Sequence, residues 1–413
     1  MSVVPSSAFE PLDVILVAPN VSEQMGGEAI KALHIYLELE KKGISVQQVT
    51  HSRVKQELDR KFPQMRVTYV YDTVLQKILY RLRMGLFLHL IFTYAARRRV
   101  LALLKDKPNA IIHFTSPVSP VLPYPALANA HVVIGPLNGN IHYPRAFRDR
   151  ETMTYKLRRW FHPFLQFGHR ISFSGKRNAD ALLVAGGRRT YDSLMMAGCK
   201  EEQFVDSIDS GVLSRLYETK RATQSGINFR FFHNGRLVKH KGTELIIKSL
   251  LLTKHPVELD IIGRGPELER LRALTSSLSL DGRVKFIEWI EDHSKLADML
   301  RQYRGFVFPS LAEANGIVVQ EAMVQGLPVV ALDWGGPSLL VTPATGVLIQ
   351  PLGEEHVIQQ LAGSLDRLAE DGDLAEKMSI EARARAFRNG YLWPGIIENW
   401  INVYRKVSAY PLG

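Results

Sequence analysis

The sequence lacks several features that mark common protein classes. Its 413 residues include one cysteine, Cys199, so no intrachain disulfide framework can form. No histidine and cysteine spacing typical of a zinc site occurs, and neither a Walker A lysine motif nor a G-x-S-x-G nucleophile elbow is present. These absences argue against a disulfide-rich secreted domain, a zinc protein, a P-loop nucleotidase and an α/β-hydrolase.

Long hydrophobic runs are also missing. The first 19 residues lack the basic start and continuous apolar segment of a secretory signal. The longest strongly apolar stretch, residues 84–96, is interrupted by His89 and Thr93, whereas a membrane span needs about 20 such residues. We therefore expect no transmembrane helix and a cytoplasmic location.

Positive charge is abundant and concentrated. The formal net charge is +11, and residues 77–107 and 145–177 are each strongly basic and rich in aromatic side chains. A solvated basic face, a nucleic-acid groove and a surface against anionic lipid are the three interpretations. No zinc-finger or RNA-recognition signature supports nucleic acid. Arg and Lys mixed with Phe, Tyr, Trp and Leu are what interfacial membrane binding requires, so lipid contact and plain solvation remain as alternatives.

Short apolar strands alternate with longer helical stretches in both halves of the chain, a pattern typical of parallel sheets covered by helices. The sequence therefore predicts an α/β protein with two Rossmann-like, doubly wound parallel-sheet domains facing a cleft. We expect an amino-terminal domain at residues 1–217, a polar linker at 218–227 and a second domain at 228–392. A helix and tail at 393–413 are expected to pack back toward the amino-terminal domain.

Two loops of the second half contain candidate anion-binding groups. After the predicted strand "FRFFHNG", Gly235 permits close backbone approach, and Arg236 and Lys241 can both point beyond the strand end. Arg offers a bidentate fork to phosphate and Lys a compact charge, although two ordinary surface cations are the alternative. Gly263 lies in "DIIGRGPELE", which lacks the third glycine of a dinucleotide fingerprint, so a plain strand-to-helix turn is equally compatible.

The segment "FVFPSLAEANGIVVQEAMVQG" reads as strand, loop and helix. The amides of Asn315, Gly316 and Ile317 would lie at the helix start, where free N–H groups favour an anion or hydroxyls. Glu321, on the second helical turn, can accept hydrogen bonds from the two hydroxyls of a ribose, and Glu313 would reach another part of the same ligand. Capping or solvated glutamates are the alternative.

Candidates in the first half are less distinctive. Gly26 and Gly27 follow the first predicted strand and could bring backbone against phosphate or acceptor, or simply form a turn. Asn138 lies in the Gly/Asn loop of residues 133–144, which opens from another strand end. His113 ends the strand "IIHFTSP", where a structural role is the alternative. The only Asp-x-Asp, in "EDGD", is better explained by a turn with a helix N-cap than by a metal site.

The segments "NGRLVKHKG", "IIGRGPELERL", "FVFPSLAEANGIVVQEAMVQGLPVVALDWGG" and "YLWPGIIENWINVYRKV", in this order and spacing, resemble the retaining glycosyltransferases of family 4, which have the GT-B fold and a Glu-x7-Glu motif. The likeness covers nearly all of residues 229–407. In the first half it rests on shorter signals such as "MGGEA", "GPLNGN" and "SIDSGV".

The resemblance implies roles for individual residues. Arg236, Lys241 and Glu313 would be catalytic: the two cations would bind the diphosphate and stabilise the leaving group, and Glu313 would hold sugar hydroxyls. Glu321 would hold the ribose, and Asn315, Gly316 and Ile317 the sugar or phosphate. The other implied donor contacts are Gly26, Gly27, Gly235 and Gly263, with Trp289 and Ile290 lining the base pocket. His113, Thr115 and Asn138 are possible sugar or acceptor contacts, and His113 and Thr115 compete for one role.

The function that the resemblance implies is transfer of a sugar from a nucleotide diphosphate sugar, with retained configuration and without cofactor or metal. Residues 1–217 would then form the acceptor domain and residues 228–392 the nucleotide-sugar donor domain. We expect the acceptor to be a lipid-linked saccharide or glycolipid of cell-envelope or exopolysaccharide synthesis, and the enzyme to lie at the cytoplasmic face of an anionic membrane. A soluble acceptor is one alternative. A nucleotide-sugar-binding scaffold without turnover is another.

Overall fold

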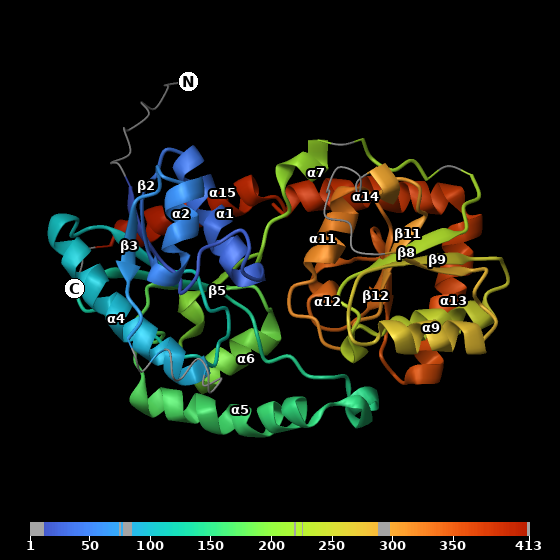
Figure 1. Cartoon of the computed structure of the whole chain (residues 1–413), viewed down its shortest axis with the longest axis horizontal. Coiled ribbons are helices and arrows are strands. Elements are labelled where there is room, and N and C mark those ends of the chain that lie inside the picture. The colour runs from blue at the N-terminus through green and yellow to red at the C-terminus, as the bar shows by residue number, and fades with distance from the viewer. Residues whose placement is uncertain are drawn as a thin grey trace. The chain divides into compact units, whose positions relative to one another are not determined.

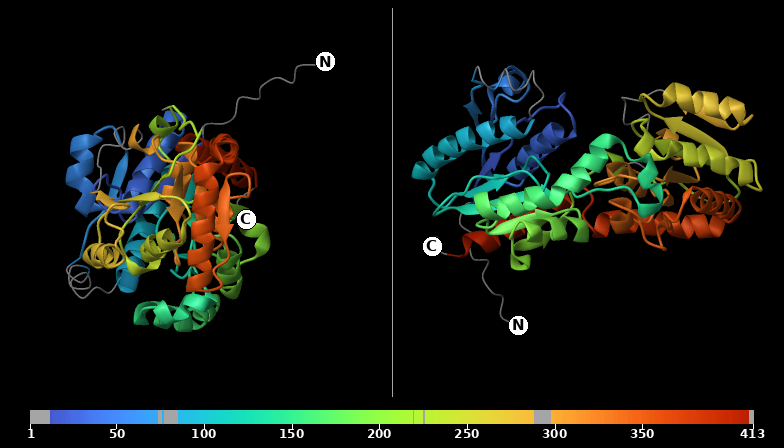
Figure 2. Two further views of the ribbon diagram at one scale, coloured as in Figure 1. Left: turned by 90° about the vertical axis from the view of Figure 1, so that its right-hand side faces the viewer. Right: turned by 90° about the horizontal axis from the view of Figure 1, so that it is seen from below.

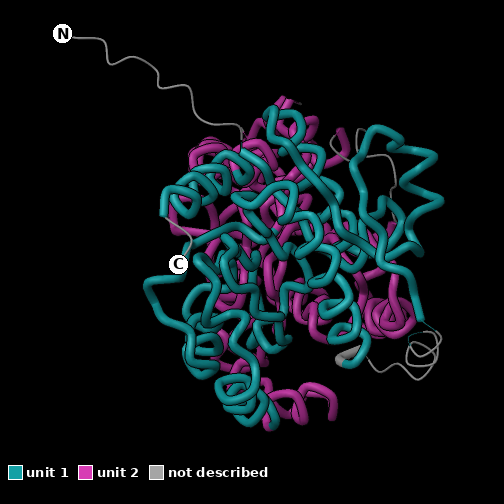
Figure 3. Tube along the Cα trace, turned by 90° about the vertical axis from the view of Figure 1, so that its left-hand side faces the viewer, with its two compact units in different colours: residues 1–140, 161–209, 396–413 teal, residues 141–160, 210–395 magenta. Residues whose placement is uncertain are grey.

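The structure is a computed structural model that describes residues 12–73, 76, 85–218, 220–224, 226–287 and 298–410. Contacts divide the chain into two compact units (Figures 1 and 3). Unit 1 comprises Met1–Asn140, Phe161–Asp209 and Ile396–Gly413, and unit 2 comprises Ile141–Trp160 and Ser210–Gly395. Each unit contains one all-parallel sheet, which confirms the predicted α/β class with two Rossmann-like domains.

The units differ from the predicted domains at an internal segment and at the boundary, because unit 2 begins at Ser210, before the predicted linker. Residues 141–160 belong to unit 2, although the sequence places them inside the amino-terminal domain. The reason is burial, because Tyr143 and Phe147 are 2% and 1% exposed within the hydrophobic core of unit 2. The terminal helix α15 (Trp393–Ser408) belongs to unit 1 from Ile396 onward.

The unit 1 sheet has seven strands in the order β3-β2-β1-β4-β5-β6-β7. Their bounds are β1 Asp13–Val17, β2 Ser45–His51, β3 Val67–Val70, β4 Ile111–Phe114, β5 His131–Leu137, β6 Ala181–Val184 and β7 Phe204–Asp206. Helices α1 (Gly27–Lys41), α2 (Lys55–Lys61), α4 (Gly85–Asp106), α5 (Met153–Ser172) and α6 (Arg188–Met196) connect them. Strand order reverses between β1 and β4, so the loops after these strands diverge and leave a site at their carboxyl ends.

The unit 2 sheet has six strands in the order β10-β9-β8-β11-β12-β13. They are β8 Arg230–Asn234, β9 Glu258–Ile262, β10 Val284–Ile287, β11 Gly305–Phe308, β12 Val329–Leu332 and β13 Gly346–Ile349. The described helices are α7 (Ser214–Glu218), α8 (Thr243–Ser249), α9 (Leu268–Ser277), α11 (Ile317–Val324), α12 (Pro337–Leu340), α13 (Glu354–Glu370) and α14 (Gly372–Arg388), and Figure 2 shows helices packed around the sheet. Here the strand order reverses between β8 and β11. Ligands of such sheets bind beside the loops that follow the two strands at the reversal.

Burial explains why the central strands are continuous apolar runs. All four residues of β11 and of β12 are buried, as expected for parallel strands covered on both faces. None of the helices within the described residues is long and apolar enough to cross a membrane.

Candidate functional site

The loops after β8 and β11 meet through a partly buried ion pair. Lys241 ends the short 3-10 turn Lys239–Lys241, and its Nζ donates to the Glu313 carboxylate. Both side chains are 16% exposed, and the Lys241 Nζ lies 4.8 Å from the ring centroid of Phe308. The structure thus joins two residues predicted separately, one to bind phosphate and one to bind sugar hydroxyls.

A backbone hydrogen bond, a glycine turn and a buried histidine fix the two loops that contain this pair. The Leu311 amide donates to the His240 carbonyl at 2.7 Å, linking the two loops directly. Gly242 has φ of 70°, and a β-carbon there would overlap the Pro309 carbonyl oxygen, so only glycine fits this turn. The ring nitrogens of the buried His233 lie 2.8 Å from the Val307 carbonyl and 3.0 Å from the Thr243 hydroxyl. Burial lowers the His233 pKa to about 4, so the ring is neutral near pH 7. Its role is structural, because it links β8 to the backbone of β11 and to the first residue of α8.

The glycines after β8 and β9 lie back to back. Gly263 has φ of 154°, and a β-carbon on it would overlap the carbonyl oxygen of Gly235, so its role here is close packing of the two loops. Gly235, with φ of 152°, has open space where its side chain would be. Arg236 follows it, exposed and without a hydrogen-bond partner in the part of the chain that the structure describes.

The start of α11 is capped by Glu313. Gly316 adopts the left-handed conformation with φ of 78°, and its amide donates to the Glu313 Oε1 at 3.2 Å. The Gly316 amide is therefore occupied by the protein itself. The amides of Asn315 and Ile317 have no acceptor among the described residues, which leaves these two N–H groups at the positive end of the helix dipole for a ligand.

Glu321 lies partly buried on the second turn of α11, and its carboxylate receives no hydrogen bond from any described residue. Burial raises the pKa of its carboxyl group to about 7. A carboxylate that is desolvated yet unpaired is destabilising, so its presence indicates a function other than stability.

A glycine pair that the sequence analysis overlooked supports the Glu313 loop. Gly335 and Gly336 follow β12 in "LDWGG", and the Gly336 amide donates to the Glu313 carbonyl at 2.9 Å. A β-carbon on Gly336 would lie 2.6 Å from the carbonyl oxygens of both Ala314 and Asn315. A double glycine directly after a strand end was the available signal.

We expect Gly336→Ala to displace this loop. The φ of Gly336 is −63°, which any residue adopts, so the effect of the added methyl group is purely steric. If the loop is part of the active site, transfer should fall by about tenfold or more, since misplacement by an ångström is costly to catalysis. Steady-state kinetics measures this. Gly363→Ala, in an exposed turn of α13 with open space at its β-carbon, is the matched control and should retain full activity.

Residues 141–160 are the second feature that the sequence analysis missed. The Trp334 indole donates to the His142 carbonyl at 2.8 Å, and Arg150 donates to Glu244 at 2.6 Å and also to Glu354. Tyr155, on the first turn of α5, lies 6.1 Å from the His240 ring centroid. Burial and, to a smaller extent, the Glu313 charge raise the Tyr155 pKa, against the opposing charge of Arg158. This segment therefore borders the Lys241–Glu313 pair.

The remaining candidates lie in unit 1. Gly26 and Gly27 are exposed where α1 begins, with open space at their β-carbon positions. The Thr115 hydroxyl, just after β4, is buried without a partner among the described residues. Asn138, after β5, accepts from Arg189 at 2.7 Å, while its buried Nδ2 has no acceptor in the described chain.

His113 has a structural role. Its Nδ1 lies 2.6 Å from the Tyr404 hydroxyl and its Nε2 lies 2.8 Å from the Gly135 carbonyl. Trp400 packs edge-on against the same ring, and burial lowers the His113 pKa to about 3. Both ring nitrogens are occupied, so of the two alternatives at this strand end only Thr115 has a polar group available.

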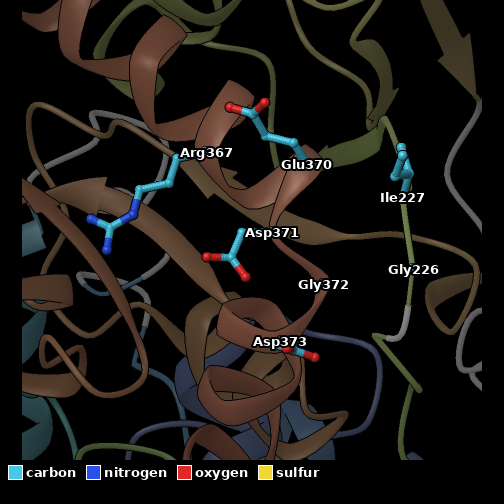
Figure 4. Close-up of a pocket in the computed structure, with 7 residues that line it drawn as sticks. All are labelled: Gly226, Ile227, Arg367, Glu370, Asp371, Gly372 and Asp373. Carbon is cyan, nitrogen blue, oxygen red and sulfur yellow. The ribbon is translucent and has the colours of Figure 1, made fainter.

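The residues predicted to line the base pocket, Trp289 and Ile290, lie outside the described residues. The carboxylates of "EDGD" border an open depression of ≈600 Å³ that contains none of the predicted site residues (Figure 4). Asp371 accepts from the Leu374 amide at 2.8 Å, which confirms the predicted N-cap. No cluster of three or more possible metal ligands occurs in the described ranges.

Comparison with known proteins finds relatives for part of the chain. Residues 220–385 match the model of the family Glycosyl transferases group 1. An uncharacterized glycosyltransferase of Methanocaldococcus jannaschii is 28% identical over 226 residues, 51% of this chain and 56% of that protein. The lipopolysaccharide core biosynthesis glycosyltransferase LpsD of Rhizobium meliloti is 32% identical over 175 residues, 42% of this chain and 49% of LpsD. The chain thus spans about half the length of these curated relatives.

The fold is shared more widely than the sequence. The structure of HepE from Anabaena, solved in complex with UDP and glucose, superposes with a TM-score of 0.61 at 18% identity and covers 96% of this chain and all of that one. The two parallel-sheet domains are those of the GT-B fold, and residues 220–385 of this chain match the family Glycosyl transferases group 1.

Proposed function

We propose that this protein is a glycosyltransferase that moves a sugar from a nucleotide diphosphate sugar to a hydroxyl of a lipid-linked saccharide or glycolipid, with retained anomeric configuration and without a metal ion. The observation that best supports this proposal is the set of groups found where the strand order of the unit 2 sheet reverses. There Lys241, free amides at the start of α11 and the unpaired Glu321 occur together within the region that matches the family.

Charge and hydrogen-bonding capacity suit a nucleotide diphosphate. Lys241 and the exposed Arg236 supply two cations at the end of β8, and the N–H groups of Asn315 and Ile317 add neutral donors. These groups are complementary to phosphate oxygens. Glu321 can accept from two neighbouring hydroxyls, as in a ribose. HepE, of the same fold, was solved with UDP and glucose, in line with a donor of this kind.

The proposed reaction breaks the bond between the anomeric carbon and the diphosphate oxygen and forms a bond to the acceptor oxygen on the same face of the sugar. The acceptor proton passes to a diphosphate oxygen, so no enzymic base is required. Lys241 and Arg236 stabilise the negative charge that grows on the leaving diphosphate. In this scheme Lys241 exchanges part of its contact with Glu313 for phosphate, and Glu313 becomes available to sugar hydroxyls.

The acceptor class rests on two supports. LpsD acts in lipopolysaccharide core synthesis by its name, and residues 145–177 form a basic, aromatic segment suited to a lipid surface.

The donor can be identified by titration calorimetry with UDP, GDP and ADP, followed by their sugar conjugates. We expect one nucleotide to bind at least about tenfold more tightly than the others, because the base pocket selects by its hydrogen bonds. Arg236→Ala should weaken binding of that nucleotide. Arg301→Ala, which removes a partly exposed cation paired only with Asp298 among the described residues, is the control. If no nucleotide binds, the proposal is wrong, and if donor binds but an acceptor panel yields no product, a binding protein without turnover is favoured.

A further inference from the structure

Helix α5 lies at the lower edge of Figure 1. It exposes apolar side chains to solvent instead of burying them. Positions 153, 157, 160, 164, 167 and 171 follow the three- and four-residue spacing that places side chains on one side of a helix. The exposed fractions of its large apolar side chains are Met153 67%, Leu157 50%, Trp160 63%, Phe161 45%, Phe164 65%, Leu165 44%, Phe167 61% and Ile171 69%. We call this set the α5 apolar stripe.

The opposite side of α5 is polar and buried. The His162 Nε2 lies 2.8 Å from the Ser193 hydroxyl, and the Gln166 Nε2 donates to the same hydroxyl at 2.5 Å and to the Pro120 carbonyl at 3.2 Å. His169 Nδ1 lies 3.4 Å from the Nζ of the buried Lys176. Turning the α5 apolar stripe inward would break these buried hydrogen bonds, and unsatisfied buried polar groups are costly. The outward direction of the stripe is therefore set by the packing of α5 on unit 1.

The positive charge beside the α5 apolar stripe favours contact with a lipid surface over contact with a second copy of this protein. Residues 152–179 contain six Lys and Arg and no acidic residue. Lys156, Arg158 and Arg170 are exposed beside the stripe. A second copy of the same helix would bring like charges together, which opposes association. An anionic lipid surface would accept the aromatic rings at the headgroup boundary and meet these cations with opposite charge.

We propose that α5 is an interfacial helix that binds this protein to anionic membranes, with the α5 apolar stripe entering the headgroup boundary and the flanking cations contacting lipid phosphates. The proposed contact is with the membrane surface. Membrane binding by α5 does not depend on the proposed activity.

One consequence does rest on the proposed function. The first two turns of α5 belong to unit 2, where Met153 and Leu157 are exposed while Tyr155 packs against Tyr143 and His240. A membrane that contacts these exposed side chains would therefore lie against the same turns that border the Lys241–Glu313 pair. A lipid-linked acceptor would reach that pair without leaving the membrane surface.

Cosedimentation with vesicles tests the proposal. Vesicles of equal parts phosphatidylcholine and phosphatidylglycerol should bind the full chain, and phosphatidylcholine vesicles should bind it far less. Binding should weaken between about 0.1 M and about 1 M salt, as the Debye length falls from ~10 Å to ~3 Å. Phe167→Ser/Ile171→Ser should reduce binding to the mixed vesicles at least about tenfold, because apolar insertion is lost. These side chains are exposed, so the variant should keep the circular dichroism spectrum and nucleotide affinity of the wild type.

Leu352→Ser/Ile380→Ser is the matched control, since it removes two comparably exposed apolar side chains elsewhere, and it should bind vesicles as the wild type does. Equal binding of wild type to both vesicle types, or unchanged binding of Phe167→Ser/Ile171→Ser, would overturn the proposal. Self-association in solution that the same double substitution abolishes would instead identify a second copy as the occupant. If the protein binds vesicles but no nucleotide, the proposed function is wrong and the proposal on membrane binding stands.

Discussion

Lys241→Ala is expected to lower kcat for sugar transfer by about 10²- to 10³-fold, the usual effect of removing one group that stabilises developing negative charge. The lysine is positioned for this role by the rigid turn that ends at Gly242 and by its contacts with Glu313 and Phe308. Because the charge on the diphosphate grows as the sugar leaves, kcat should fall more than the affinity for donor. Steady-state kinetics and calorimetric donor titration separate the two.

A partly buried Glu313 would be left unpaired in this variant, which could lower stability as well. The double variant Lys241→Ala/Glu313→Gln removes that charge and should recover thermal stability without recovering activity. Lys248→Ala is the matched control, because Lys248 forms a 2.6 Å ion pair in the same unit with Glu354 rather than with Glu313. Wild-type rates for Lys241→Ala would exclude the lysine from catalysis.

Glu321→Gln should make the unliganded protein more stable near pH 8 and bind nucleotide more weakly. Burial raises the carboxyl pKa from an ordinary 4.5 to about 7. Between these values the folded state holds a proton that the unfolded state has released, so stability falls as pH rises through this window and then levels off. The penalty at pH 8 is up to about 3 kcal/mol, and glutamine removes it. Denaturant unfolding near pH 4 and pH 8 measures the difference, which should vanish at the lower pH.

Nucleotide affinity should respond in the opposite sense. Ribose hydroxyls donate to the ionised carboxylate, so wild-type affinity should increase as pH rises through about 7, whereas that of Glu321→Gln should not. Loss of a charged acceptor should weaken binding near pH 8 by about 10- to 100-fold. Glu355→Gln, on the exposed first turn of α13, should change neither stability nor affinity appreciably. A pH-independent affinity in the wild type would argue against Glu321 as the ribose ligand.

Strands that are continuous apolar runs were easier to predict from the sequence than a strand with buried polar residues. β4, β11 and β12 are continuous apolar runs because helices cover both faces of the sheet. β2 was not predicted, since its run "SVQQVTH" contains Gln48 and Thr50 at buried positions. Gln48 is accommodated because its side-chain amide donates to the carbonyls of Leu16 and Val49, partners that the apolar pattern does not reveal.

Apolar periodicity and glycine placement act over a few residues, so they were enough to predict two parallel-sheet domains and the side chains that follow each strand end. The contacts that these side chains make depend on the folded chain. It pairs Lys241 with Glu313 across 72 positions and commits His113 to Tyr404 across 291, and it directs the apolar side of α5 outward. Such contacts depend on strand order and on the packing of distant segments, which no local pattern specifies.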